Sequence, residues 1–230
     1  KVMAENQCRK IIFSSSATIY GNNNQLKIDE NNSLKALNPY GETKIAIENL
    51  LRNIYDSSPN KWGIINLRYF NPIGAHESGL IGENPIGTPN NIFPIINLVA
   101  QGKNEKLAIY GNDWETHDGT GVRDFIHVCD CAEGHIRALE FLNKEKTTLI
   151  NLNIGTGKGY SVLDLIKTFE KVNKVSIPYF FAKRREGDCG SVIADNSLAK
   201  KILKWEPSLT LEQMCLDGWK WTKINPNGFQ

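Results

Sequence analysis

The sequence lacks the features expected of a secreted, membrane-spanning or nucleic-acid-binding protein. It contains no run of 18 apolar residues, and its first residues contain no apolar stretch of signal-peptide length. The 27 basic and 25 acidic residues nearly balance, and no long basic tract marks a nucleic-acid or membrane-surface footprint. Any anionic ligand must therefore be bound by a few well-placed cations.

Cysteine pairs and metal-binding patterns are also missing. The five cysteines are odd in number, widely spaced and without a CxxC pair, so neither a disulfide framework nor a zinc site is expected. The four histidines have no HxxxH or HxxE spacing, so we expect no other metal site. Reduced thiols and the absence of a leader predict a cytoplasmic protein.

Apolar runs alternate with amphipathic stretches along the 230 residues, and no Pro/Ser-rich linker divides them. This alternation predicts an α/β fold. Strands are predicted at 11–16, 64–69, 107–110, 149–154 and 177–181. Helices are predicted at 40–55, 92–101, 128–142, 161–172, 197–203 and 211–223. Polar loops are predicted at 21–37, 71–91 and 111–123.

Two polar motifs follow the first predicted strand. Ser14-Ser15-Ser16 ends that strand, and Tyr40 and Lys44 lie one helical turn apart on the next helix. In an open α/β sheet the carboxyl ends of the strands are where ligands bind. A cation beside a phenol stabilises the phenolate, which can then act as a base. Either motif alone is more often a solvated helix face or a turn, but their order predicts a proton-transfer site.

Seven segments together identify a family. They are FSSSATIYG (13–21), NPYGETK (38–44), LRYFNPIGAH (67–76), GTPNNIFP (87–94), LAIYGNDW (107–114), DGTGVRDFIHV (118–128) and RREGD (184–188). In these motifs, their order and their spacing the chain resembles the extended short-chain dehydrogenase/reductase family, and within it the UDP-glucose 4-epimerases. The resemblance covers essentially the whole chain.

The resemblance implies a Rossmann-like doubly wound parallel sheet plus a smaller α/β substrate-binding domain. The NAD-binding part would comprise 1–72, with 125–155 returning to it, and the UDP-sugar-binding part mainly 73–124 and 156–230. The chain would then hold the C-terminal two-thirds of such an enzyme, with the glycine-rich NAD-binding turn N-terminal to it. Family members commonly form homodimers through a helical bundle that includes the YxxxK helix.

The activity implied by the resemblance is the interconversion of UDP-glucose and UDP-galactose in galactose metabolism, by transient oxidation at C4 with NAD as cofactor. Tyr40 would be the catalytic base, Lys44 would hold the nicotinamide ribose, and Ser16 would bind the reacting hydroxyl. Tyr69 and Phe70 would line the nicotinamide pocket. These five residues make up the expected cofactor-binding set.

The resemblance also implies a set of UDP-sugar-binding residues. They are Asn71, Asn90, Asn91, Leu107, Ala108, Tyr110, Arg123, Arg185, Asp188 and Val192. The two arginines would bind the diphosphate, because guanidinium forks suit phosphate oxygens, and Asp188 would contact the uridine ribose. Val192 matches a site where a large aromatic narrows the pocket, so its small side chain favours tolerance of N-acetylated sugars.

Two alternatives remain open at this point. Related nucleotide-sugar dehydratases carry an acidic residue just after the strand-end Ser or Thr, whereas this chain has Ala17 and Thr18 there, which favours epimerisation without elimination. The second alternative is a module that binds UDP-sugars without catalysis.

The segment Gly155–Tyr160 follows a predicted strand but lacks the third glycine of the dinucleotide fingerprint. We interpret it as a turn before a helix that is capped by Ser161 and Asp164.

Overall fold

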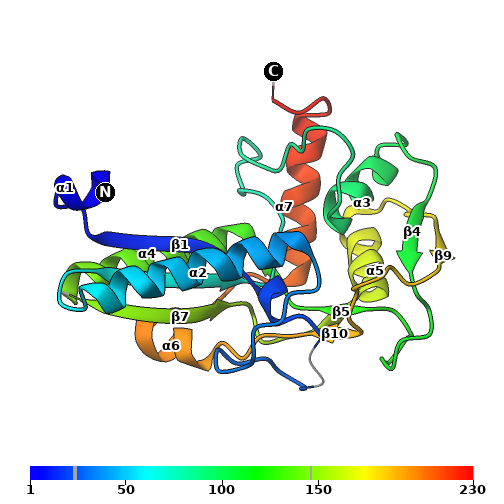
Figure 1. Ribbon diagram of the computed structural model, residues 1–230. Helices are drawn as coiled ribbons and strands as arrows, with labels where there is room; N and C mark the ends of the chain where they lie inside the picture. The colour runs from blue at the N-terminus through cyan, green and yellow to red at the C-terminus, as the bar shows by residue number, and fades with distance from the viewer. Residues whose placement is uncertain (23–24, 146, 230) are drawn as a thin grey trace.

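The computed structural model describes residues 1–22, 25–145 and 147–229, and its elements form two adjoining parts (Figure 1). The first part is a three-stranded sheet with helices on both faces. The second part contains shorter strands and three helices. The predicted loop at 21–37 includes residues 23–24, which lie outside the described residues. No helix of the described residues is long and apolar enough to cross a membrane.

The sheet of the first part is parallel, in the order β1-β2-β7. Its strands are β1 (Lys10–Ser16), β2 (Gly63–Tyr69) and β7 (Thr148–Ile154). The register pairs Ser16 with Tyr69, and Tyr69 with Ile154. All three strands therefore end at the same edge of the sheet.

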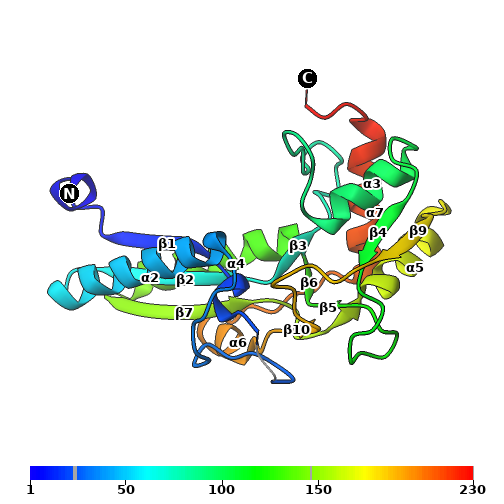
Figure 2. The ribbon, with the colours of Figure 1, turned by 45° about the vertical axis from the view of Figure 1, so that its right-hand side comes forward.

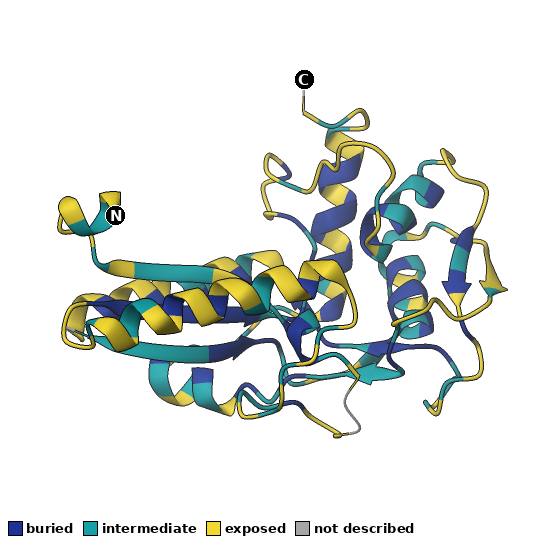
Figure 3. Cartoon of the chain, in the orientation of Figure 1, coloured by how far each residue is buried: buried dark blue, intermediate teal, exposed yellow. Residues whose placement is uncertain are grey.

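Helices cover both faces of this sheet, which explains why the central strand β2 is buried along almost all of its length (Figure 3). These helices are α2 (Pro39–Ser57), α4 (Val128–Lys144) and α6 (Ser197–Leu203). Ile64 and Leu149 pack with Leu51 of α2, whereas Ile65 and Leu152 pack on the other face, against α4 and α6. Successive strand residues point to opposite faces, so the sheet is doubly wound, as expected.

The second part is built around one apolar cluster between its helices (Figure 2). Its helices are α3 (Ile92–Ala100), α5 (Val162–Asn173) and α7 (Leu211–Ile224). Strand β4 (Leu107–Tyr110) pairs with β9 (Tyr179–Ala182). Strand β5 (Val122–Arg123) lies between β8 (Tyr160–Ser161) and β10 (Ser191–Val192) and pairs with both. Phe93, Phe169 and Trp219 meet edge to face at the centre of this cluster. The parallel pair of β3 (Asn71–Ile73) with β6 (Phe125–His127) lies where the chain passes between the two parts.

The α/β fold and the longer predicted elements are confirmed, with two bounded as predicted, the strand at 107–110 and the helix at 197–203. The first strand ends in the three serines as predicted, because Ser14 to Ser16 pair with Leu67 to Tyr69. Two expectations were wrong in detail. The strand expected at 177–181 begins at Tyr179, since Ile177 is instead buried in the apolar cluster. The predicted loops contain β3 and β5, and the 3-10 helix η1 (Ala17–Tyr20) precedes the loop predicted at 21–37. All three elements are too short to show periodicity.

Candidate functional site

The start of α2 brings Tyr40 to the edge where the three parallel strands end. Asn38 caps the helix by accepting a hydrogen bond from the Gly41 N–H at 2.8 Å, and Pro39 occupies the first turn. A Cβ at Gly41 would lie 2.7 Å from the Ala36 Cβ and 3.1 Å from the Thr18 carbonyl oxygen. The glycine therefore lets the first turn of the helix pack closely on η1, while the Tyr40 side chain remains 56% exposed.

Lys44 lies next to Tyr40 and is anchored to β1. Its Nζ donates a hydrogen bond to the Ser14 carbonyl oxygen at 2.9 Å. The same nitrogen lies 5.3 Å from the centroid of the Tyr40 ring and 5.1 Å from that of Phe13. The structure therefore places an ammonium group beside the exposed Tyr40 ring at the strand ends.

The strand-end hydroxyls form two separate hydrogen-bonded pairs. The Ser16 hydroxyl bonds the Thr18 hydroxyl and accepts the Thr18 N–H at 3.3 Å, so that it caps η1. On the neighbouring strand the Tyr69 hydroxyl donates to the Ser14 hydroxyl at 2.9 Å and contacts Nε2 of His135. Burial raises the pKa of Tyr69 to about 12, which keeps this phenol neutral at physiological pH.

Neither Ser14 nor His135 was expected among the site residues from the sequence. Ser14 belongs to the same triplet as Ser16, but only the parallel pairing shows that its backbone and side chain bind Lys44 and Tyr69. His135 lies within α4 and has no local motif.

The ring of Phe70 is only 7% exposed and packs under η1 in a cluster with Ala17.

The second half of the candidate site lies around β5 and β10. The register pairs Arg123 with Val192, so the two lie side by side on neighbouring strands. Burial lowers the pKa of the Arg123 guanidinium. The charge of Asp188 raises this pKa and the charge of Arg185 lowers it, which indicates that both residues lie close to Arg123. Arg185 binds Asp188 at 3.3 Å and stacks 4.2 Å from the centroid of the Tyr110 ring. The structure thus brings these five residues together.

The other expected UDP-sugar residues are less closely grouped. Along β4, Ala108 is half-buried and Tyr110 exposed, whereas Leu107 is 1% exposed in the apolar cluster. Asn91 precedes α3 without capping it through its side chain, and its side chain binds Glu83 instead. Asn90 is exposed beside it. The half-buried Asn71 donates its backbone N–H to the Asp124 carbonyl oxygen at 3.0 Å.

The segment that follows η1 connects the two halves. Ile28 bridges Ala194, and the Ile28 N–H donates to the Ile193 carbonyl oxygen at 2.9 Å. The Cys189 thiol donates to the Gly21 carbonyl oxygen at 3.5 Å. These contacts place the chain between η1 and α2 against the strand that carries Val192 and its flanking residues.

The glycine-rich turn after β7 is not a phosphate-binding loop. The buried Asp124 carboxylate accepts the backbone N–H groups of Thr156 and Gly157, each at 2.8 Å, and that of Ala194 at 3.1 Å. Because these N–H groups are already bonded, they are not free to bind a phosphate. The turn leads into α5 with the predicted capping box of Ser161 and Asp164, which is confirmed.

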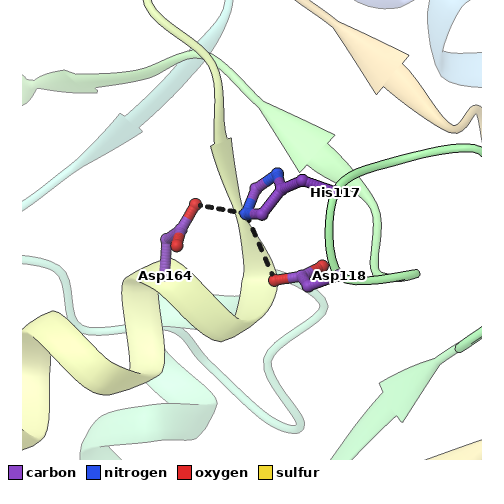
Figure 4. A group of neighbouring side chains, drawn as sticks. All are labelled: His117, Asp118 and Asp164. Atoms are coloured by element: carbon purple, nitrogen blue, oxygen red, sulfur yellow. Dashed lines mark ion pairs between the residues drawn. The ribbon is translucent and has the colours of Figure 1, made fainter.

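One cluster of potential metal ligands lies at the start of α5 (Figure 4). Nε2 of His117 points between two carboxylates, 3.5 Å from Asp118 and 3.3 Å from Asp164. The same two carboxylate oxygens already accept hydrogen bonds from the Ser161 hydroxyl and the Ser161 N–H. Hydrogen bonds from Ser161 and Thr120 lower the pKa of Asp118 despite its partial burial. We interpret the trio as a capping cluster.

Comparison with known proteins identifies close relatives over nearly the whole chain. The family model described as GDP-mannose 4,6 dehydratase matches residues 1–217. The UDP-glucose 4-epimerase of Bacillus subtilis is 52% identical over 96% of this chain. The match spans 65% of that relative, so the chain covers slightly less than two thirds of its length.

Two solved structures of proteins with bound ligands share the fold of this chain. A UDP-glucose 4-epimerase from Stenotrophomonas maltophila, with bound NAD and formylated UDP-arabinopyranose, is 45% identical with a TM-score of 0.94, and the match covers 97% of this chain and 66% of the other. One from Bifidobacterium longum, in complex with NAD⁺ and UDP, is 46% identical with a TM-score of 0.93, and the match covers 99% and 68%.

Proposed function

The chain belongs to the family described as GDP-mannose 4,6 dehydratase, and from this premise we propose that it interconverts UDP-glucose and UDP-galactose with NAD as cofactor. The observation that carries the proposal is the placement of Tyr40 and Lys44 over the ends of parallel strands. The names of its relatives, which are UDP-glucose 4-epimerases at about half identity, support the choice of reaction.

In this proposal Tyr40 removes the proton from the C4 hydroxyl of the hexose, and Ser16 binds that hydroxyl. Lys44 stabilises the phenolate and binds the nicotinamide ribose, with Tyr69 and Phe70 beside the ring. When bound, NAD accepts the hydride from C4 and returns it to the opposite face of the 4-keto sugar. Tyr40 then gives the proton back, so that no proton or cofactor is consumed over a turnover.

The residues present fit the nicotinamide-ribose end of NAD. Lys44 and the exposed Tyr40 stand at the carboxyl ends of the strands, which is where open α/β sheets bind dinucleotides. The glycine-rich turn after β7 does not fit the pyrophosphate, because Asp124 occupies its N–H groups.

We assign the diphosphate to Arg123 and Arg185, the uridine ribose to Asp188, and the uracil to the strand Leu107, Ala108 and Tyr110. The stacking of Arg185 on Tyr110, within reach of Asp188, supports this grouping. Asn71, Asn90 and Asn91 complete the proposed set around the sugar and phosphates. Residues 1–72 and 125–155 then form the NAD-binding part, and 73–124 with 156–230 mainly the UDP-sugar-binding part.

The experiment measures bound NAD(H) by absorbance and fluorescence of the purified chain, together with conversion of UDP-galactose to UDP-glucose. Retained cofactor with turnover supports the epimerase. Calorimetric binding of UDP without turnover supports the second candidate, a non-catalytic UDP-sugar-binding module. Turnover with loss of water would indicate a dehydratase. The contact of Ser16 with Thr18, instead of with an acidic residue, argues against that reaction.

Substrate range depends on Val192 in this proposal. Valine beside Arg123 leaves more room than an aromatic residue, so the N-acetylated pair UDP-GlcNAc and UDP-GalNAc is accepted as well. Steady-state kinetics of both substrate pairs test this, with Val192→Tyr as the variant expected to lose only the N-acetylated pair. Undetectable turnover of that pair by the wild-type chain would exclude it.

A homodimer through α2 is the proposed assembly. Ile47 and Leu50 leave apolar surface on this helix, with 37% and 57% of each side chain exposed. Sedimentation of the wild-type chain and of Leu50→Lys tests it, since a charge there should favour the monomer.

The proposed location is the cytoplasm, the site of galactose metabolism, and it suits the free cysteines Cys8, Cys129, Cys131, Cys189 and Cys215.

A further inference from the structure

A buried ion pair lies beneath the YxxxK helix. Glu48 of α2 and Arg68 of β2 are 2% and 1% exposed. The Arg68 guanidinium binds both carboxylate oxygens of Glu48, through Nη2 at 2.7 Å and Nε at 3.0 Å. Neither residue takes part in the proton transfer proposed above, so the presence of two full charges in the core calls for a separate reason.

The pair connects α2 with four other segments. The Ser15 hydroxyl on β1 donates to the Glu48 carboxylate at 2.6 Å. Nη1 of Arg68 donates to the Tyr20 hydroxyl of η1 at 2.9 Å and to the Glu30 carbonyl oxygen at 3.1 Å. The Tyr20 hydroxyl in turn donates to Asn153 of β7 at 2.6 Å. One carboxylate on α2 is thus tied to the sheet, to η1 and to the segment that reaches β10.

Stability alone explains this pair poorly. Removing two charges from water costs about as much as their attraction returns, and apolar side chains of the same volume often serve as well. A bidentate pair differs from apolar packing in being directional, because the planar guanidinium holds the carboxylate in one orientation. Glu48 therefore fixes how α2 is rotated and how deeply it sits on the sheet.

This rotation controls the proposed catalytic groups. Tyr40, Lys44 and Glu48 are spaced by four residues, so they lie on successive turns of one helix face, about 6 Å apart along the axis. Two of these three residues bond β1 directly: Lys44 donates to the Ser14 carbonyl oxygen, and Glu48 accepts from the Ser15 hydroxyl. A roll of the helix at Glu48 would withdraw Lys44 from Ser14 and Tyr40 from the strand ends.

We propose that Glu48 and Arg68 are positioning residues, which hold Tyr40 and Lys44 over the serines that end β1. Their effect on turnover rests on the proposed function, whereas their effect on the position of Lys44 does not. The experiment has two readouts for this reason, and only the second requires the chain to be an epimerase.

The first readout is competitive acetylation of the full chain by acetic anhydride, with each lysine quantified by mass spectrometry. In Glu48→Gln we expect the labelling rate of Lys44 to rise at least threefold relative to the exposed Lys61 and Lys171 in the same sample. General loosening of the fold would also raise the labelling rate of Lys200 on α6, which is half-buried and pairs with Glu206. Glu133→Gln, which breaks the exposed pair of Glu133 with Arg137 on α4, is the matched control and should leave every ratio unchanged.

The second readout is steady-state turnover with NAD and UDP-galactose. In Glu48→Gln we expect kcat to fall at least tenfold while KM for UDP-galactose stays within twofold, because the UDP-binding residues lie on other elements. Ser15→Ala removes only one hydrogen bond to Glu48 and should change Lys44 labelling and kcat in the same direction but less. If circular dichroism shows that Glu48→Gln is unfolded, Ser15→Ala replaces it in both readouts.

The two failures are distinguishable. If the wild-type chain shows no turnover, the proposed function fails for this chain, and the labelling readout alone decides the inference. If the Lys44 ratio stays at the wild-type value in folded Glu48→Gln and Ser15→Ala, the positioning role is wrong, whatever the turnover. Equal labelling changes in the Glu133→Gln control would overturn it too.

Discussion

Around Tyr40 the functional side chains are held by groups buried in the sheet, whereas around Arg185 they are held mainly by other side chains at the surface. Lys44 bonds a strand carbonyl, and its helix is tied down by the buried Glu48–Arg68 pair. Arg185 is 52% exposed on its side chain and pairs with the neighbouring Asp188. Arg123 is intermediate, since it is partly buried on a short strand.

This difference matches what each proposed task requires. Proton transfer needs the base within hydrogen-bond distance of one hydroxyl, so small displacements are costly. Recognition of a diphosphate by long cationic side chains tolerates movement, because the attraction is longer in range and several oxygens can be bonded. The first half of the site is therefore built on a rigid scaffold and the second on adjustable side chains.

The largest effect is expected for Tyr40→Phe, which removes the proposed base from the rigid half. Turnover should fall by a factor of about 10²–10⁴, the range for loss of a general acid–base group. Stability should change by less than about 0.5 kcal/mol, because the side chain is exposed. Steady-state assays and urea unfolding measure the two quantities. Turnover near wild type would rule out Tyr40 as the base.

Arg68→Met should destabilise the fold by about 3–5 kcal/mol, because it leaves the buried Glu48 carboxylate without its partner. The double variant Glu48→Leu/Arg68→Met should recover most of this loss while the Lys44 position remains disturbed. Urea unfolding measures the loss of stability in the single variant and in the double variant. A single variant as stable as wild type would mean that the rigid half does not depend on this pair.

In the surface half, Arg123→Ala should weaken UDP binding by about ten- to a hundredfold, in line with about 1.5–3 kcal/mol for a charge-assisted hydrogen bond. Arg185→Ala should weaken it only about threefold, since exposed charges contribute less. Isothermal titration with UDP separates them. Equal losses at both positions would contradict the division into a partly buried and an exposed cation.

The smallest effect is expected from salt. Raising sodium chloride from about 0.05 to 0.5 M shortens the Debye length to a few ångströms, so UDP affinity should fall a few-fold through screening of the exposed Arg185. The coupling free energy of Glu48 with Arg68, from a double-mutant cycle in urea, should stay within about 0.5 kcal/mol, because water and ions do not reach the pair. A coupling that weakens as much as UDP binding would argue against a dry interior there.

Local patterns predicted much of the fold. The apolar residues Ile64, Ile65 and Leu67 indicated a buried strand. The four-residue spacing of Tyr40 and Lys44 placed them on one helix face, and Ser161 with Asp164 indicated a helix start. Each of these depends on residues within one or two turns of each other. The two-residue strands β5, β8 and β10 were missed because they exist only through their partners.

The chemistry-bearing residue types, their spacing and the α/β order were determined by the sequence alone, since periodicity and motif spacing are properties of neighbouring residues. Only the tertiary structure decided which of them meet. Lys44 bonds the carbonyl oxygen of Ser14 rather than Ser16. The Asp124 carboxylate accepts a hydrogen bond from Thr156, 32 positions further along the chain. Arg68 pairs with Glu48, 20 positions before it. Contacts between distant segments depend on how faces pack, which no local pattern encodes.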